Sequence, residues 1–285
     1  MVNSNSGVEG GSGYSFQRCC VVFLLFEGYE EINSKNYFIC LEHHEDFLFA
    51  YLDEHGKLNK IDTYQAKKSR DDWRTDDDLC EIIGKMTMVG KELISDPIEK
   101  SNDYQHTLTF LTNRNILLTS KKENGEKQDK VKVQVSNKRK KYSDLSDKIK
   151  NNIEPRICQS ILENTQLEHI YFQYIDFAQS HKNWQRELKG LAIEHFGQQV
   201  NDHEAVISTL MQLLEDVAQT YNDDNKALLS DQSKRVTKNK INETFKMFTE
   251  SRKSFDFWRQ YSDQISTQLN LKLPIRRRAV IPPKN

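Results

Sequence analysis

The chain has 285 residues, and its 41 basic and 42 acidic side chains leave a formal net charge of −1. Hydrophobic residues make up 36% and charged residues 29%, a polar composition that fits one or two globular domains. The longest apolar run, Cys19–Phe26, is far shorter than the roughly 20 residues that cross a bilayer, and no basic-then-apolar signal segment opens the chain. These features argue against a membrane protein and predict a cytoplasmic location.

Several patterns that would define other protein classes do not occur in the sequence. The five cysteines are unevenly spaced and form no Cys-x-x-Cys pair, which disfavours a disulfide framework and a zinc knuckle. The chain contains no Gly-Lys-Ser/Thr motif and no Gly-x-Ser-x-Gly motif. An NTPase of the P-loop class and a serine hydrolase are therefore disfavoured.

The first part of the chain predicts a helix followed by strands. Residues 1–12 are rich in Gly, Ser and Asn and are expected to form a flexible leader. The apolar segment 14–25 predicts a buried helix that ends at Gly28. Three segments of strand character follow, and a turn at Gly56 predicts that the last two form a hairpin. The expected strands cover residues 36–41, 47–52 and 61–65.

An amphipathic helix is predicted over Asp76–Leu93, where apolar residues recur every three or four positions. Several aspartates lie around its start, and we favour N-terminal capping by Thr75 or Asp76 over a cation site. A further strand is expected at Thr107–Leu111, and alternating valines in the lysine-rich segment Lys121–Lys141 indicate an edge ribbon.

Beyond Tyr142 the sequence pattern becomes mainly helical, with one strand-like stretch at His169–Phe177. We therefore expect a mixed α/β domain over residues 13–180, a helical domain for oligomerisation or partner docking over 181–272, and a basic tail over 273–285. The expected helices cover residues 145–162, 176–196, 202–221 and 241–269.

Local basic stretches on this neutral chain are candidate DNA contacts. Clustered lysines and arginines can follow a phosphate backbone, but solvated loops are also rich in lysine, so both interpretations stay open. The candidate DNA-binding residues are Lys68, Lys138, Arg139, Lys140 and Lys141.

A candidate catalytic site combines Asp46 with Gln65 and Lys67. Residues two apart on a strand face the same side, so Gln65 and Lys67 point together, and the predicted hairpin can bring Asp46 to them. The Asp46 carboxylate, the Gln65 amide oxygen and the Ala66 backbone carbonyl are oxygen ligands suited to Mg²⁺ or Mn²⁺. The Lys67 ammonium would position a water or neutralise developing charge, which fits phosphodiester cleavage.

At these residues the sequence resembles a known family. The elements Gly13-Tyr14-x-Phe16-Gln17, Glu42-His43-His44-Glu45-Asp46 and Tyr64-Gln65-x-Lys67-Lys68 are together similar to the double-stranded DNA endonuclease domain of CD-NTase-associated CBASS effectors and of Lamassu nuclease subunits. This domain is a PD-(D/E)xK nuclease in the Gln-x-Lys variant shared with Mrr-type restriction enzymes.

The resemblance covers about residues 13–177 and implies a restriction-endonuclease-like α/β fold, with a mixed sheet flanked by helices and followed here by a helical C-terminal extension. It also implies Mg²⁺-dependent cleavage of double-stranded DNA in anti-phage defence. Asp46 matches the family's metal-binding aspartate, Gln65 the variant second acid and Lys67 the catalytic lysine.

Three further residues are auxiliary candidates. Gln17 occupies the helix position that in related nucleases often holds a glutamate. If the strand alternates through this segment, Glu42, His44 and Asp46 share one face and Glu42 is the possible extra ligand. A bulge would favour Glu45 instead.

The C-terminal region is short for the nucleotide-sensing domain of the CBASS effectors, so the resemblance favours a Lamassu-like arrangement. It implies a nuclease subunit held by an SMC-like ATPase and a small accessory subunit, inactive until it is released or forms a homo-oligomer. Two alternatives stay open: a non-catalytic module that binds DNA or a partner through a degenerate nuclease fold, and an RNA-directed nuclease of the same fold.

Overall fold

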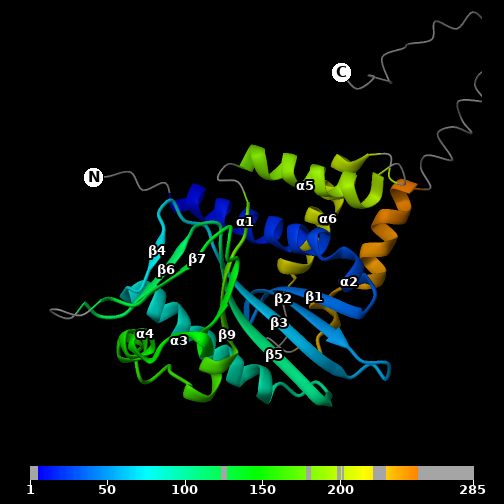
Figure 1. Ribbon diagram of the computed structural model, residues 1–285. Coiled ribbons are helices and arrows are strands. Elements are labelled where there is room, and N and C mark those ends of the chain that lie inside the picture. The colour runs from blue at the N-terminus through cyan, green and yellow to red at the C-terminus, as the bar shows by residue number, and fades with distance from the viewer. Residues whose placement is uncertain are drawn as a thin grey trace, which may run out of the picture.

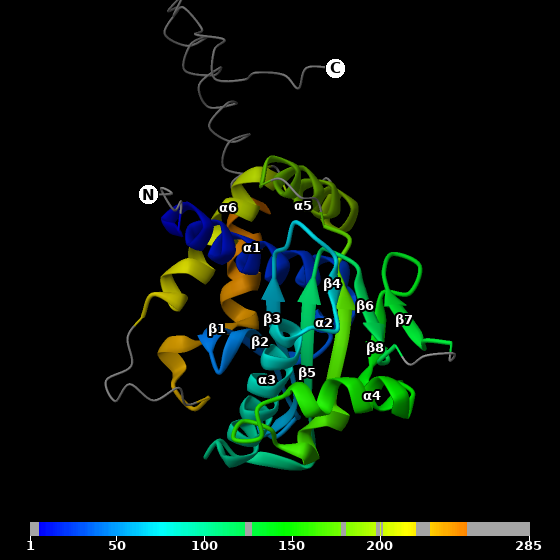
Figure 2. The same cartoon turned by 90° about the vertical axis from the view of Figure 1, so that its left-hand side faces the viewer.

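A computed structural model describes residues 6–122, 127–177, 181–197, 200, 202–220 and 229–249. Within these residues, a seven-stranded mixed sheet with the strand order β10-β1-β2-β3-β5-β9-β8 forms the centre of the protein, and β4, β6 and β7 form a separate small sheet (Figures 1 and 2). The strands are β1 (Asn36–His43), β2 (Glu45–Leu52), β3 (Leu58–Lys67), β4 (Trp73–Arg74), β5 (Lys100–Thr112), β6 (Ile116–Thr119), β7 (Lys130–Val133), β8 (Arg139–Lys141), β9 (Ile170–Tyr174) and β10 (Val236–Thr237).

The central sheet combines an antiparallel meander with a parallel half. Strands β1, β2 and β3 pair antiparallel, whereas β5 pairs parallel with both β3 and β9. Parallel neighbours need a long crossover connection, and α3 (Asp77–Ser95) provides it between β3 and β5. The short strands β10 and β8 lie antiparallel at the two edges.

Helices cover both faces of this sheet (Figures 1 and 2). One hydrophobic cluster joins α1, α5 and α6 to one face of the meander, and a second joins α3 and α4 to the other face. The helices are α1 (Ser6–Glu27), α2 (Tyr29–Asn33), α3, α4 (Asp147–Ile153), α5 (His181–Phe196) and α6 (His203–Ala218), with 3₁₀ turns at η1 (Tyr142–Asp144), η2 (Glu154–Arg156), η3 (Asn164–His169) and η5 (Gln232–Lys234). The mixed sheet between helical layers confirms the expected α/β class.

Most of the predicted elements are present in the structure. The three strands of the meander, α3 and β5 lie where the sequence patterns placed them, and α1 ends one residue before Gly28. Asp76 caps α3 as expected, because its Oδ1 accepts a hydrogen bond of 3.0 Å from the Leu79 N–H. The first helix begins at Ser6, inside the segment expected to be a leader.

The single helix predicted over residues 145–162 is wrong. Helix α4 ends at Ile153, and the 3₁₀ turn η2 follows with Pro155 in its first turn. Proline lacks the N–H that an α-helix interior requires, so it ends the regular helix. The helix expected from residue 241 occupies residues 238–249 in the described part of the chain, and residues 250–269 of that prediction lie outside it.

The helices beyond residue 180 pack against the first helix. Trp184 and Phe196 of α5 contact Phe16 and Phe26 of α1, with ring centroids 5.4 and 5.5 Å apart. The expected division into domains at residue 180 stays a prediction.

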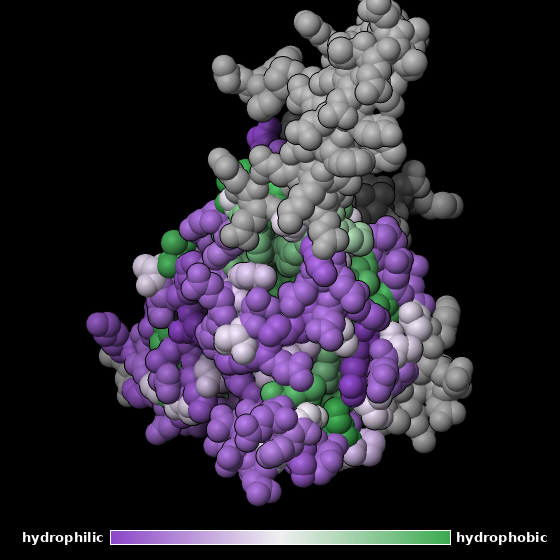
Figure 3. Space-filling model, turned by 90° about the vertical axis from the view of Figure 1, so that its right-hand side faces the viewer, coloured by the Kyte–Doolittle hydropathy of each residue, from purple (hydrophilic) through white to green (hydrophobic). Residues whose placement is uncertain are grey.

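The face that carries residues 238–249 is mainly hydrophilic and has smaller apolar areas (Figure 3). No helix within the described ranges has the length and apolar character needed to cross a membrane.

Candidate active site

The chain reverses direction between β1 and β2 at His44 alone. His43 at the end of β1 is paired with Glu45 at the start of β2. Glu42 and His44 have positive φ angles of 51° and 62°, in the left-handed region that non-glycine residues rarely adopt. The segment is a turn between two strands, so the alternation considered for residues 42–46 in a single strand does not apply.

Asp46 lies next to the end of β3. Its Oδ2 atom accepts a hydrogen bond of 2.7 Å from the Ala66 N–H and lies 3.8 Å from the Lys67 Nζ atom. The backbone ladder between β2 and β3 begins one residue further on, at the pair Phe47 and Tyr64. The Asp46 carboxylate therefore takes the place of a backbone acceptor at the point where the two strands separate.

Extending the register by one residue places Gln65 opposite Asp46, because the last pair of the antiparallel ladder is Phe47 with Tyr64. Opposite residues share a face of the sheet, and so do residues two apart on one strand, so Asp46, Gln65 and Lys67 lie on one face. Ala66 packs in the hydrophobic cluster under α1, which agrees with this alternation. The structure thus brings the three predicted catalytic residues together.

The Ala66 carbonyl is directed to the same side as its N–H. Within a strand, the N–H and C=O of one residue point to the same neighbouring strand, and the Ala66 N–H points to Asp46. The backbone carbonyl named as a third oxygen ligand is therefore on the Asp46 side of β3.

Two further carboxyls lie within the electrostatic influence of Asp46. Burial raises the pKa of Glu45 to about 8, Asp46 adds to this increase, and Lys67 opposes it. The Glu45 Oε1 atom is buried and has no hydrogen-bond partner. Partial burial of the carboxyl and the charge of Asp46 also raise the pKa of Glu42, although its side chain is exposed overall, and Lys67 and Arg18 oppose this shift. Both glutamates remain auxiliary candidates.

Gln17 lies on α1 with a half-buried side chain, one helical turn before Cys20. Burial raises the pKa of the Cys20 thiol well above its usual value, and the charge of Asp46 contributes to the shift. The charge of Asp46 thus acts on a residue of α1, and a role for Gln17 stays a prediction.

The candidate DNA-binding residues lie in two places. The Lys68 ammonium is 5.1 Å from the ring centroid of Trp184 on α5. At the β8 edge, Arg139 and Lys141 both lie over the Tyr171 ring, at 4.2 and 5.8 Å from its centroid. Their neighbours Lys138 and Lys140 make ion pairs of 3.6 Å with Glu27 and Asp144, respectively.

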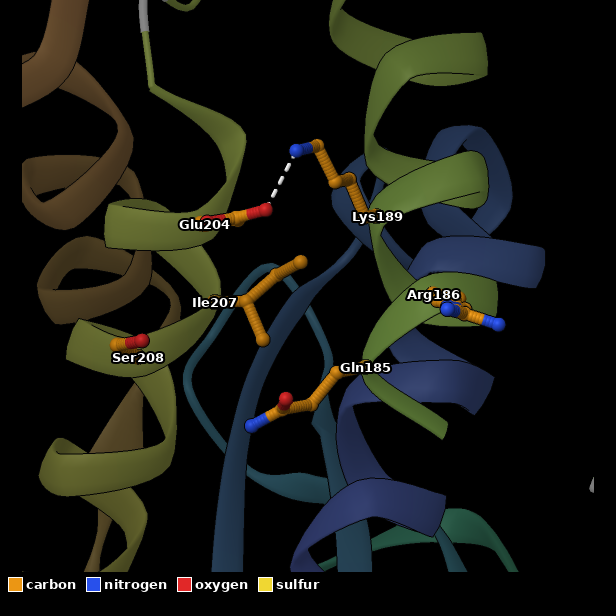
Figure 4. Close-up of a pocket in the computed structure, with 6 residues that line it drawn as sticks. All are labelled: Gln185, Arg186, Lys189, Glu204, Ile207 and Ser208. Carbon is orange, nitrogen blue, oxygen red and sulfur yellow. Dashed lines mark hydrogen bonds and ion pairs between the residues drawn. The ribbon is translucent and has the colours of Figure 1, made fainter. Parts of the chain in front are cut away.

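A separate pocket of about 300 Å³ lies between α5 and α6 (Figure 4). The Lys189 ammonium forms an ion pair with Glu204 across it. Its lining residues are Gln185, Arg186, Lys189, Glu204, Ile207 and Ser208. None of the residues predicted from the sequence to act in catalysis lines this pocket.

The oxygen-donor set at Asp46 suits a hard divalent cation. Among the described residues, no three His, Cys, Asp or Glu side chains form a metal-binding group. Asp46, Gln65 and the Ala66 carbonyl contribute oxygens only, and a small set of protein oxygens is typical of Mg²⁺, which keeps several waters. These residues fit such an ion.

A central mixed sheet between helical layers is the architecture of the restriction-endonuclease-like nuclease class. The family model for the Cap4 double-stranded DNA endonuclease domain matches residues 5–221 of the 285. The chain therefore belongs to the Cap4 dsDNA endonuclease domain family, which supports a DNA nuclease of anti-phage defence. Comparison with curated proteins and with solved structures gives no match.

Proposed function

We propose that the protein is a metal-dependent endonuclease for double-stranded DNA, with Asp46, Gln65 and Lys67 as its catalytic centre. The observation that carries this proposal is the position of the Asp46 carboxylate, 2.7 Å from the Ala66 nitrogen and 3.8 Å from the Lys67 ammonium. A carboxylate, an amide and an ammonium gathered at one strand end are the groups that phosphodiester hydrolysis needs.

In this proposal, Asp46, the Gln65 amide oxygen and the Ala66 carbonyl would hold Mg²⁺ or Mn²⁺. The bound ion would polarise the phosphate and lower the pKa of a water. Lys67 orients the attacking water and stabilises the negative charge that develops on the phosphate oxygens. The hydrogen bond from the Ala66 N–H keeps the Asp46 carboxylate at the end of β3 before a ligand arrives.

Metal binding tests the proposal directly. Asp46→Asn keeps the size of the side chain but removes its charge, so we expect it to abolish both Mn²⁺ binding in calorimetry and Mg²⁺-dependent cleavage of plasmid DNA. The matched control is Asp53→Asn, at the β2–β3 turn where the side chain accepts hydrogen bonds from His55 and Lys57 N–H groups. Unchanged metal binding by Asp46→Asn would contradict the assignment. An RNA substrate in parallel would reveal an RNA-directed nuclease.

We further propose that the nuclease acts in a Lamassu-like defence complex, with an SMC-like ATPase and an accessory subunit, and that it is inactive until released or assembled into a homo-oligomer. This rests on the sequence resemblance and on the need to restrain a nuclease inside a living cell. Cleavage per molecule is expected to rise with protein concentration, in step with the assembly state measured by light scattering. Constant specific activity across the oligomerisation range would contradict it.

A non-catalytic assembly module is the alternative. It is favoured by the donor set itself, because the Asp46, Gln65 and Ala66 oxygens include a single carboxylate and Gln17 is neutral. Under this alternative, DNA binding would be sensitive to salt, insensitive to EDTA and never followed by cleavage.

A further inference from the structure

The β1–β2 turn is held in a conformation that its sequence does not favour. Glu42 and His44 are side-chain-bearing residues with φ angles of 51° and 62°. Such a backbone persists where surrounding contacts impose it, and these outliers concentrate at functional sites. Asp46 follows this turn by two residues, so the contacts that fix the turn also fix the position of its carboxylate.

The His44 side chain anchors the turn to the end of α3. The side chain is 7% exposed, and its Nδ1 atom lies 3.2 Å from Glu92 Oε2 in the last turn of that helix. Its Nε2 atom lies 3.7 Å from Asp96 Oδ2, immediately after the helix end. The imidazole is thus placed between two carboxylates of one helix end.

Asp96 is in turn held by a segment that is distant in the sequence. Its side chain is fully buried, and its Oδ1 atom accepts a hydrogen bond of 2.9 Å from the Ile98 N–H. Its Oδ2 atom, the one that approaches His44, accepts a hydrogen bond of 2.8 Å from the buried N–H of Leu229. One carboxylate oxygen therefore joins the turn to a segment that begins 133 residues after Asp96.

Residues 229–237, called here the C-terminal arm, are attached to the sheet beside β1. Arg235 Nε donates a hydrogen bond of 2.8 Å to the Leu229 carbonyl, Nη2 donates a second one, and the guanidinium lies 4.2 Å from the centroid of the Phe38 ring. Strand β10 then pairs with β1, with Phe38 opposite Thr237. The arm is thus attached to β1 near the start of the strand, and Glu42 lies near the end of the same strand.

We propose that the C-terminal arm positions the active site: by fixing Asp96 it fixes His44, and through His44 it keeps the Asp46 carboxylate opposite Gln65. Asp96 and His44 are positioning residues in this scheme and do not touch the substrate. The arm lies beyond residue 221, where the match to the Cap4 domain ends. A partner that drew the arm away from Asp96 would loosen the turn and weaken metal binding. The effect on catalysis rests on the proposed function, but the effect on the turn does not.

The test uses the full chain and measures the turn itself. Arg235→Ala removes the hydrogen bonds to the Leu229 carbonyl and changes no residue of β1 or β2. Asp96→Asn keeps the shape of the side chain that accepts from the Ile98 and Leu229 N–H groups but removes its charge. We expect amide hydrogen exchange in residues 41–47 to accelerate by about tenfold or more in both variants, because the free energy of local opening of the turn becomes smaller. Lys91→Ala is the control, since that residue neighbours Glu92 on α3 but pairs with Glu163. It should leave exchange in the turn unchanged.

A double-variant cycle tests the order of the contacts. His44→Gly removes the anchor while its glycine accepts the positive φ without strain. If the arm acts through His44, Arg235→Ala should weaken Mn²⁺ binding several-fold in the wild-type background and have little further effect in the His44→Gly background. Rescue of Mn²⁺ affinity is expected for His44→Asn, which tolerates this backbone and retains a donor.

Unchanged exchange in the turn for both Arg235→Ala and Asp96→Asn would overturn the inference, and so would fully additive effects in the cycle. If exchange in the turn accelerates in both variants but the wild type never cleaves DNA, the positioning role is supported and the proposed nuclease activity is contradicted. If the wild type cleaves DNA but exchange in the turn is unchanged in both variants, the nuclease activity is supported and the positioning role is contradicted.

Discussion

Replacing Glu45 by glutamine should stabilise the metal-free protein at neutral pH and above. The Glu45 side chain is 9% exposed, and its pKa is raised from 4.5 to about 8 by burial and by the neighbouring charge of Asp46. The folded protein therefore binds this proton more tightly than the unfolded chain does. The stabilising effect of the protonated carboxyl is fully present below pH 4.5 and is lost as the pH rises through 8.

The size of this effect follows from the difference between the two pKa values. Each pH unit within the window changes the free energy of unfolding by about 1.4 kcal/mol, so the wild type should lose roughly 2–3 kcal/mol between pH 5 and pH 7 from this residue alone. Glutamine does not titrate and is not subject to this loss. The stability difference between Glu45→Gln and wild type should therefore grow by roughly 2–3 kcal/mol in favour of the variant over the same interval.

Urea denaturation in EDTA at several pH values measures this difference. Glu54→Gln is the matched control, because the Glu54 side chain is 87% exposed and its replacement should show no such trend. A stability difference between Glu45→Gln and wild type that stays constant from pH 5 to pH 8 would refute the reasoning.

Two further predictions concern the core and the proposed DNA-contact residues at the β8 edge. A Cβ atom at Gly90 would lie 2.3 Å from Gln166 Oε1 and 2.9 Å from a methyl of Leu108, and this Gln166 oxygen is bound to the buried His106. Gly90→Ala should therefore lower the free energy of unfolding by roughly 1–3 kcal/mol, although alanine has the better helix propensity. Gly190→Ala, where nothing lies within 4 Å, should instead raise the melting temperature slightly, and equal effects at both positions would contradict a steric clash at Gly90. Arg139→Ala should weaken DNA binding similarly for all sequences and reduce the salt dependence of log K by about one unit, whereas the exposed Lys85→Ala on α3 should not. An unchanged salt dependence for Arg139→Ala would contradict a DNA contact at the β8 edge.

The elements that could be predicted from the sequence are those defined by local patterns. The strands of the meander and α3 follow from hydrophobic periodicity, and the Asp76 cap follows from residue type at a helix start. The juxtaposition of Asp46 with Gln65 and Lys67 was also predictable, because a hairpin connection and strand alternation bring them together. Pro155 gave a local signal against one long helix over 145–162, which the apolar spacing concealed.

The contacts that hold the site could not be predicted in the same way. Glu42 and His44 adopt positive φ angles although neither is glycine, so residue type gives no warning of the turn. The bond between Leu229 and Asp96 joins positions 133 residues apart, and the two-residue strand β10 is too short for any periodicity. Burial of Glu45 likewise depends on tertiary packing and has no signature in the sequence.

The most direct test of the nuclease assignment is plasmid cleavage by the wild type and by Lys67→Ala, each with Mg²⁺ and with EDTA, at dilute and concentrated protein. Lys60→Ala is the control, since Lys60 lies on the same strand and pairs with Asp62. We predict cleavage by the wild type and the control that requires Mg²⁺ and is lost in Lys67→Ala without a change in melting temperature. Cleavage by Lys67→Ala at the wild-type rate would contradict the assigned catalytic centre.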